Sequence, residues 1–186
     1  MRNRAWTAAC GLLAAAALLL GASAVSDGAW TKAAAWFASA AIGAGSVVLR
    51  RTFPPFLGLL LTLAAMVNTA GYVFHLWHQR TSFDEAVHGF TFFAGTASAG
   101  WFFLRRTPHL QGLYWKAALV GLMVGLAWEG FEWAIGIVGD TRDTVIDLLM
   151  DVVGALAAAA LLQWTIGSHR PGKNTPANGG LKHAEG

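Results

Sequence analysis

Six long apolar stretches constrain the fold of this chain more than any other feature of its sequence. Each contains about 20 mostly apolar residues, the length that a helix needs to cross a bilayer. The stretches are Ala5–Val25, Ala29–Leu49, Phe53–Trp77, Phe83–Leu104, Leu113–Val138 and Asp143–Ile166. The expected fold class is therefore all-α: a polytopic membrane helical bundle with about six transmembrane helices.

The composition supports a membrane protein rather than a soluble one. Only 12% of the residues are charged and the mean hydropathy is +0.49, whereas a soluble domain carries about 25% charge. The basic pI of about 9.4 does not indicate nucleic-acid binding, because the basic residues of a membrane protein mainly mark the loops on its cytoplasmic side. We expect one transmembrane domain over residues 1–166. Residues 167–186, rich in Gly, Pro, Asn and Lys, are expected to form a disordered cytoplasmic tail.

The first stretch allows a second interpretation. Arg2 and Arg4, an apolar core and the small residues Ala22, Ser23 and Ala24 resemble a secretory signal peptide with its cleavage site. The stretch is long, however, and the next apolar stretch follows at once. These features favour an uncleaved first transmembrane helix.

The basic residues predict the orientation of the bundle. Alternate loops and both termini carry Arg2, Arg4, Arg50, Arg51, Arg105, Arg106, Lys116, Arg170, Lys173 and Lys182, whereas the opposite side carries Lys32, Arg80 and Arg142. The positive-inside rule then places both termini in the cytoplasm. For a bacterial chain, this means a multi-pass protein of the inner membrane with its acidic residues toward the outer face.

Acidic residues are concentrated in two short parts of this apolar sequence. Eight of the ten acids are Asp84, Glu85, Glu129, Glu132, Asp140, Asp143, Asp147 and Asp151. Four of them (Glu129, Glu132, Asp147 and Asp151) lie inside the predicted membrane helices. An ionisable side chain at such a depth costs at least ~2.5–3.5 kcal/mol unless it is paired, protonated or hydrated. The sequence therefore predicts a polar site.

Helical spacing predicts that these polar side chains meet. Residues three or four apart share one face of a helix, as do Asp84 with His88, Glu129 with Glu132, and Asp143 with Asp147 and Asp151. Counted at about 1.5 Å per residue from the helix ends, the three helices carry their polar residues to similar depths. We expect one cluster of His88, Glu129, Glu132, Asp147 and Asp151. The alternative is that each residue pairs separately with a neighbour.

A cluster of carboxylates suggests a bound cation, because like charges at close quarters repel. The candidate ligands are Asp84, His88, Glu129, Glu132, Asp147 and Asp151. This donor set suits Mg²⁺, Mn²⁺ or Ca²⁺, or, with the imidazole, Zn²⁺ or Fe. The spacing matches no established metal signature, since the fifth stretch has Glu-x-x-Glu where di-iron bundles have Glu-x-x-His. The alternatives are protonation of Glu129 or Asp151 and neutralisation by Arg142 or Arg80.

Three segments carry a resemblance to known families. They are Phe83-Asp-Glu-Ala-Val-His88-Gly, Trp128-Glu-Gly-Phe-Glu-Trp133 and the run from Gly139 to Gly154 that contains Arg142, Asp147 and Asp151. Together, over residues 83–160, they resemble the YjdF-like family of uncharacterised bacterial inner-membrane proteins and, more distantly, the VanZ-like family named for teicoplanin resistance. The matching positions are Asp84, His88, Glu129 or Glu132, Arg142, Asp147 and Gly154. Asp151 departs from the pattern, which usually has Asn there. The resemblance implies a helical bundle and an envelope role but supplies no reaction.

The favoured function is an envelope protein whose outward-facing acidic pocket binds a cation and binds, or acts on, a membrane lipid or lipid-linked headgroup. If it is an enzyme, hydrolysis or transfer is expected, with catalytic roles for His88, Glu129, Glu132 and Asp147. Arg142 and Asp143 would bind the substrate. The alternatives are a small transporter or proton-coupled carrier and a structural subunit without catalysis. The inner halves of the helices carry almost no ionisable groups, which disfavours a carrier.

Overall fold

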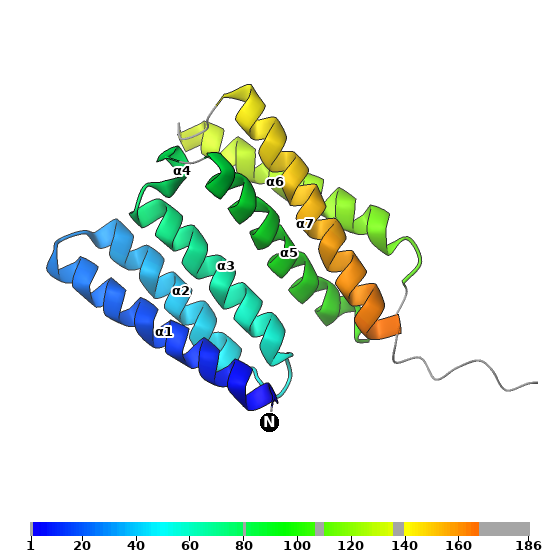
Figure 1. The fold of residues 1–186 in the computed structure, drawn as a ribbon, viewed down its shortest axis with the longest axis horizontal. Coiled ribbons are helices and arrows are strands. Elements are labelled where there is room, and N and C mark those ends of the chain that lie inside the picture. Colours follow the sequence, from blue (N-terminus) through cyan, green and yellow to red (C-terminus); the bar gives the residue numbers. More distant parts are fainter. Residues whose placement is uncertain (1, 80, 107–109, 136–139, 168–186) are drawn as a thin grey trace, which may run out of the picture.

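All the regular secondary structure is helical in the computed structural model, which describes residues 2–79, 81–106, 110–135 and 140–167 (Figure 1). The helices are α1 (Arg2–Ser26), α2 (Trp30–Val48), α3 (Pro55–Val73), α4 (Leu76–Gln79), α5 (Thr81–Leu104), α6 (Leu113–Ile135) and α7 (Thr141–Gly167). The expected all-α bundle of six long helices is confirmed. Residues 168–186 of the expected disordered tail lie outside the described residues, and Gly167 is the last residue of α7.

Four of the described helices (α1, α3, α6 and α7) are long and apolar enough to cross a membrane. The other two long helices are less apolar: α2 contains Lys32 and many small residues, and α5 contains Asp84, Glu85 and His88. Helix α5 packs against both α3 and α7, so protein rather than lipid surrounds much of it. The molecule is therefore a polytopic helical membrane protein.

The long helices form two groups of three (Figure 1). Helices α1, α2 and α3 pack on one another, α5 and α6 both pack along α7, and contacts between α3 and α5 join the groups. The N-terminus and the end of α7 lie at the same end of the bundle. This arrangement places the beginnings of α5 and α7 and the end of α6 together at the opposite end.

One predicted helix boundary is wrong. The stretch Phe53–Trp77 was expected to be one helix, but α3 ends at Val73 and α4 begins at Leu76. His75 adopts a φ of 55°, a left-handed conformation that commonly ends a helix. The chain then turns back, and the indole of Trp77 lies so close to Gly71 that a side chain at position 71 would collide with it. Apolar composition alone did not show this reversal.

Small residues allow the closest helix contacts. Gly154 of α7 lies directly on the backbone of Gly89 and Phe93 in α5. Gly121 and Gly125 of α6 face α7, where Gly121 lies against Ala155. The two glycines are four residues apart, a Gly-x-x-x-Gly spacing that commonly permits close packing of membrane helices. The three helices that carry the acidic residues are consequently held close together along α7.

Buried polar side chains also link neighbouring helices. The side-chain amide of Asn68 in α3 donates to Thr91 Oγ1 in α5 at 2.7 Å. The hydroxyls of Ser39 in α2 and Thr69 in α3 are 2.8 Å apart and hydrogen-bonded. Asn68 and Thr69 thus form hydrogen bonds between helices, as polar side chains in membrane bundles commonly do. Such bonds satisfy groups that lipid cannot solvate.

Candidate functional site

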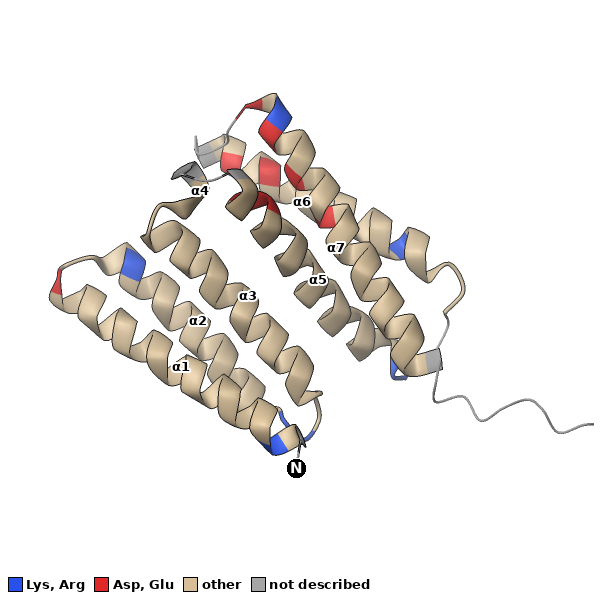
Figure 2. Ribbon diagram, in the orientation of Figure 1, with Lys and Arg blue, Asp and Glu red and all other residues tan. Residues whose placement is uncertain are grey.

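Charge is separated between the two ends of the bundle (Figure 2). Acidic residues gather where α5 and α7 begin and where α6 ends, whereas most of the described Lys and Arg residues lie toward the opposite end. The two helices that begin there direct the positive ends of their dipoles toward the acids, which stabilises Asp84 and Asp143 in their first turns. Glu129 and Glu132 lie instead near the negative end of α6, where a further negative charge is unfavourable.

A histidine–carboxylate pair lies at the centre of the acidic end. His88 Nδ1 of α5 is 3.0 Å from Asp151 Oδ1 of α7, and the two residues are 8% and 0% exposed. When Asp151 is ionised, Nδ1 donates its proton to the carboxylate, which leaves Nε2 as the nitrogen that can accept a proton or bind a metal. This pairing is typical of the way proteins orient metal-binding histidines.

Two further carboxylates converge with His88. Glu129 of α6 and Asp147 of α7 are 5% and 3% exposed, and each offers an oxygen within 4.8 Å of the other and of a ring nitrogen of His88. We call His88, Glu129 and Asp147 the inner triad. One oxygen each of Glu129, Asp147 and Asp151 is buried with no hydrogen-bond partner among the described residues. Such oxygens are costly unless another group or an ion satisfies them.

A second group of acids lies beside the inner triad. Asp84 and Asp143 offer oxygens within 4.8 Å of each other and of Asp147, and both are partly exposed. Asp84 Oδ1 is also 4.0 Å from His88 Nε2. Asp147 therefore belongs to both groups, and it connects the buried triad to the more exposed rim.

Two residues expected at the site are not members of these groups. Glu132 is partly buried and Arg142 is exposed, and neither belongs to a convergent group among the described residues. Arg142 forms no ion pair with any residue that the structure describes. The side chain of Arg80 lies outside the described residues. Neutralisation of the acids by Arg142, one of the alternatives to a cation, is thus not seen among the described residues.

One acidic residue has a structural role that the sequence analysis missed. Asp140 Oδ1 accepts a hydrogen bond of 2.9 Å from the backbone N–H of Asp143, so Asp140 caps the N-terminus of α7. An aspartate before a helical stretch is a standard capping signal, and the position of Asp140 directly before Thr141 could have revealed it. Asp140 is exposed and is not a member of the inner triad.

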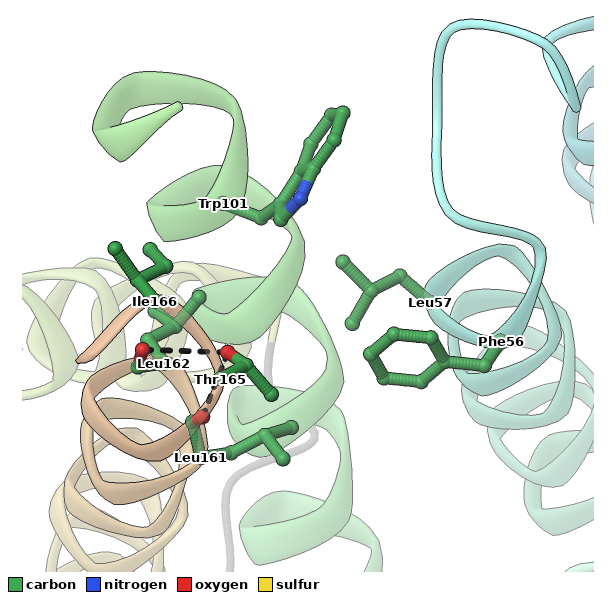
Figure 3. Close-up of a pocket in the computed structure, with 7 residues that line it drawn as sticks. All are labelled: Phe56, Leu57, Trp101, Leu161, Leu162, Thr165 and Ile166. Carbon is green, nitrogen blue, oxygen red and sulfur yellow. Dashed lines mark hydrogen bonds between the residues drawn. The ribbon is translucent and has the colours of Figure 1, made fainter. Parts of the chain in front are cut away.

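A cavity of about 180 Å³ adjoins His88 and is also lined by Asn68, Thr91, Phe92, Val124 and Trp128. It offers room for part of a ligand next to the buried histidine. A different pocket, of about 290 Å³, lies between α3 and the later parts of α5 and α7 (Figure 3). Its lining is apolar apart from Thr165, whose hydroxyl donates to backbone carbonyls of α7. The Figure 3 pocket therefore offers no chemistry comparable to that of the acidic end.

Residues 5–167 match the model of a family described as a predicted membrane protein (DUF2238). The chain belongs to this family. The match includes nearly all of the described helices and every residue of the inner triad. Neither a curated protein nor a solved structure matches the chain. Membership of DUF2238 establishes a membrane protein and assigns no role to individual residues.

The His88–Asp151 pair in this DUF2238 protein generates the first prediction. Asp151→Asn keeps an oxygen that can accept the proton of His88 Nδ1, so the free energy of unfolding in detergent should change by less than about 1 kcal/mol. Asp151→Leu removes the acceptor and leaves a buried donor unpaired, which should lower the free energy of unfolding by about 1–3 kcal/mol. Thermal or denaturant unfolding of the purified variants measures both. Equal losses in the two variants would show that the charge of Asp151, and not the hydrogen bond, is required.

Proposed function

We propose that this protein binds a divalent cation at the inner triad and binds, or acts on, the polar headgroup of a lipid or lipid-linked molecule in a bacterial envelope. One observation carries the proposal. Three deeply buried carboxylate oxygens, on Glu129, Asp147 and Asp151, lack a described hydrogen-bond partner, and two of these carboxylates converge with His88.

A cation would resolve the electrostatics of this end of the bundle. Buried carboxylates are rarely left without a partner, because they lose their hydration and gain nothing in return. Among the described residues, no Lys or Arg pairs with Glu129, Asp147 or Asp151, and His88 pairs with Asp84 and Asp151. Glu129 lies near the negative end of the α6 dipole, which further disfavours its ionised form unless a positive charge is close by.

The inner triad has a suitable donor set for such an ion. Two carboxylate oxygens and one imidazole nitrogen suit Mn²⁺, Zn²⁺ or Fe, and Mg²⁺ and Ca²⁺ favour the oxygens. We assign His88 Nε2, Glu129 and Asp147 as ligands and Asp151 as the residue that orients His88. Asp84 and Asp143 would complete the coordination or bind water at the rim of the site. Compared with the ligand set expected from the sequence, this assignment leaves out Glu132 and Asp151 and adds Asp143.

The same residues can support chemistry on a bound headgroup. A divalent cation beside His88 can polarise an ester or phosphate group, and Glu132 and His88 are positioned at the same end to exchange protons with substrate. Arg142, exposed near the beginning of α7, would attract an anionic headgroup to the site. If the protein is an enzyme, hydrolysis or transfer at a lipid headgroup is the reaction class that these residues favour.

The distribution of ionisable residues favours this function over a proton-coupled carrier. After His88 in α5 and after Asp151 in α7, the helices contain no further Asp, Glu, His, Lys or Arg. Helix α6 has no ionisable residue between Lys116 and Glu129. A relay of intramembrane ionisable groups, which proton-coupled carriers use, would therefore stop halfway across the bundle.

We further propose a bacterial inner-membrane location with both termini cytoplasmic. The ten-to-three distribution of basic residues in the sequence supports this orientation, and the resemblance to the YjdF-like and VanZ-like families supports the envelope role. A cysteine substituted for Arg105 in a Cys10→Ser background should resist a membrane-impermeant thiol reagent in intact cells. Labelling of this cysteine in intact cells would show that the loop lies outside and that the orientation is the opposite of the one proposed.

The cation proposal predicts a specific stabilisation. Mn²⁺ should stabilise the wild-type protein, by about 2.7 kcal/mol when its concentration is 100 times the dissociation constant, and EDTA should reverse the effect. Asp147→Asn and Glu129→Gln should abolish most of this stabilisation because each replaces an anionic ligand with a neutral amide, which binds a divalent cation more weakly. Thermal unfolding in detergent with and without MnCl₂ measures it.

Asp140→Asn is the matched control for these variants. It removes one acid from the same end of the bundle but keeps a good N-cap for α7, so its response to Mn²⁺ should equal that of the wild type. The proposal fails if Mg²⁺, Ca²⁺, Mn²⁺ and Zn²⁺ all leave wild-type unfolding unchanged. It also fails if Asp147→Asn retains the full response.

A further inference from the structure

A groove follows the seam between α5 and α6. These two helices both pack along α7 but make few contacts with each other. The resulting cavity has a volume of about 280 Å³ and is lined by Thr91, Phe92, Gly95, Thr96, Ala99, Val120 and Val124. We call it the α5–α6 groove. Several of its residues, including Gly95, Val120 and Val124, are exposed, so in a membrane the groove faces lipid.

The α5–α6 groove leads directly to the inner triad. It shares Thr91, Phe92 and Val124 with the cavity that adjoins His88, so the two spaces are neighbours. From His88 to Ala99, α5 advances about 16 Å at 1.5 Å per residue. This is close to half of the ~30 Å hydrocarbon thickness of a bilayer, which is the depth occupied by the acyl chains of one leaflet.

The path is apolar in the groove and polar at the inner triad, just as a phospholipid has apolar acyl chains and a polar headgroup. The α5–α6 groove is lined by apolar and small residues, whereas its neighbouring cavity ends at His88, Asn68 and Trp128. The acids of the inner triad alone would repel a phosphate. A divalent cation held by those acids would instead attract it, so a headgroup phosphate and the proposed cation are complementary in charge.

We propose that the α5–α6 groove binds an acyl chain of a phosphate-bearing membrane lipid, which enters sideways from the bilayer and places its headgroup at the inner triad. The proposal deepens the proposed function and rests on it for the headgroup. It names the substrate class and its route of entry. The acyl-chain part depends only on the shape and exposure of the groove.

Gly95 provides a direct test of the groove. A side chain added at Gly95 meets no atom within 4 Å, so Gly95→Phe should fill the groove without disturbing the helices. Gly45→Phe in α2 is the matched control, because Gly45 is also a helix residue with open space around it and α2 packs against α1 and α3 rather than α5 or α6. Both variants should keep the Mn²⁺ response of the wild type.

The experiment uses vesicles of phosphatidylglycerol and phosphatidylethanolamine that contain a phosphatidylglycerol with a photoreactive acyl chain. After illumination, mass spectrometry locates the labelled residues. We expect wild type and Gly45→Phe to be labelled at Thr91–Ala99 and Val120–Val124, and Gly95→Phe to lose this labelling. Removing Mn²⁺, or introducing Asp147→Asn, should reduce the labelling of the groove.

Three results would overturn the proposal. They are an unlabelled groove in the wild type, unchanged groove labelling in Gly95→Phe, and cross-links that place a helix of a second copy in the groove. The proposed function is judged separately by the Mn²⁺ response. Groove labelling that depends on Gly95 but not on Mn²⁺ or Asp147 would support acyl-chain binding and overturn the proposed headgroup position.

Discussion

Carboxylates buried inside a membrane bundle need a partner, and this requirement organises the second half of the molecule. Glu129, Asp147 and Asp151 are almost completely buried, where neither water nor lipid can solvate a charge. His88 satisfies one oxygen of Asp151. The remaining buried oxygens have no hydrogen-bond partner among the described residues, and the proposed cation would satisfy them.

The packing of α5, α6 and α7 serves this cluster. Gly154 permits α7 to lie on the backbone of α5, and Gly121 and Gly125 permit α6 to lie on α7. Gly125 faces Asp151 itself, so a larger residue there would displace the carboxylate that orients His88. Because α5 and α6 scarcely touch each other, the same packing that assembles the inner triad also leaves the α5–α6 groove open to lipid.

Much of this architecture could be predicted from the sequence. Apolar stretches of membrane length located the long helices, and spacings of three and four residues placed the acids on common faces. Spacing could not show which oxygens converge, because that depends on the rotation of three helices about their axes. Tertiary contacts also decide three features that the sequence did not show. They are the pairing of Asp151 with His88, the exposure of Arg142 and the chain reversal at His75. The capping role of Asp140 carried a local signal that could have been used.

The identity of the metal ligands tests the central claim most directly. Mn²⁺ bound to the purified protein can be examined by pulsed electron paramagnetic resonance, which detects nitrogen atoms coordinated to the ion. The account predicts coupling to one imidazole in the wild type and in Asp151→Asn, and its loss in His88→Gln. Bound Mn²⁺ that shows no nitrogen coupling in the wild type, or coupling that persists in His88→Gln, would contradict the assignment of His88, Glu129 and Asp147 as the cation site.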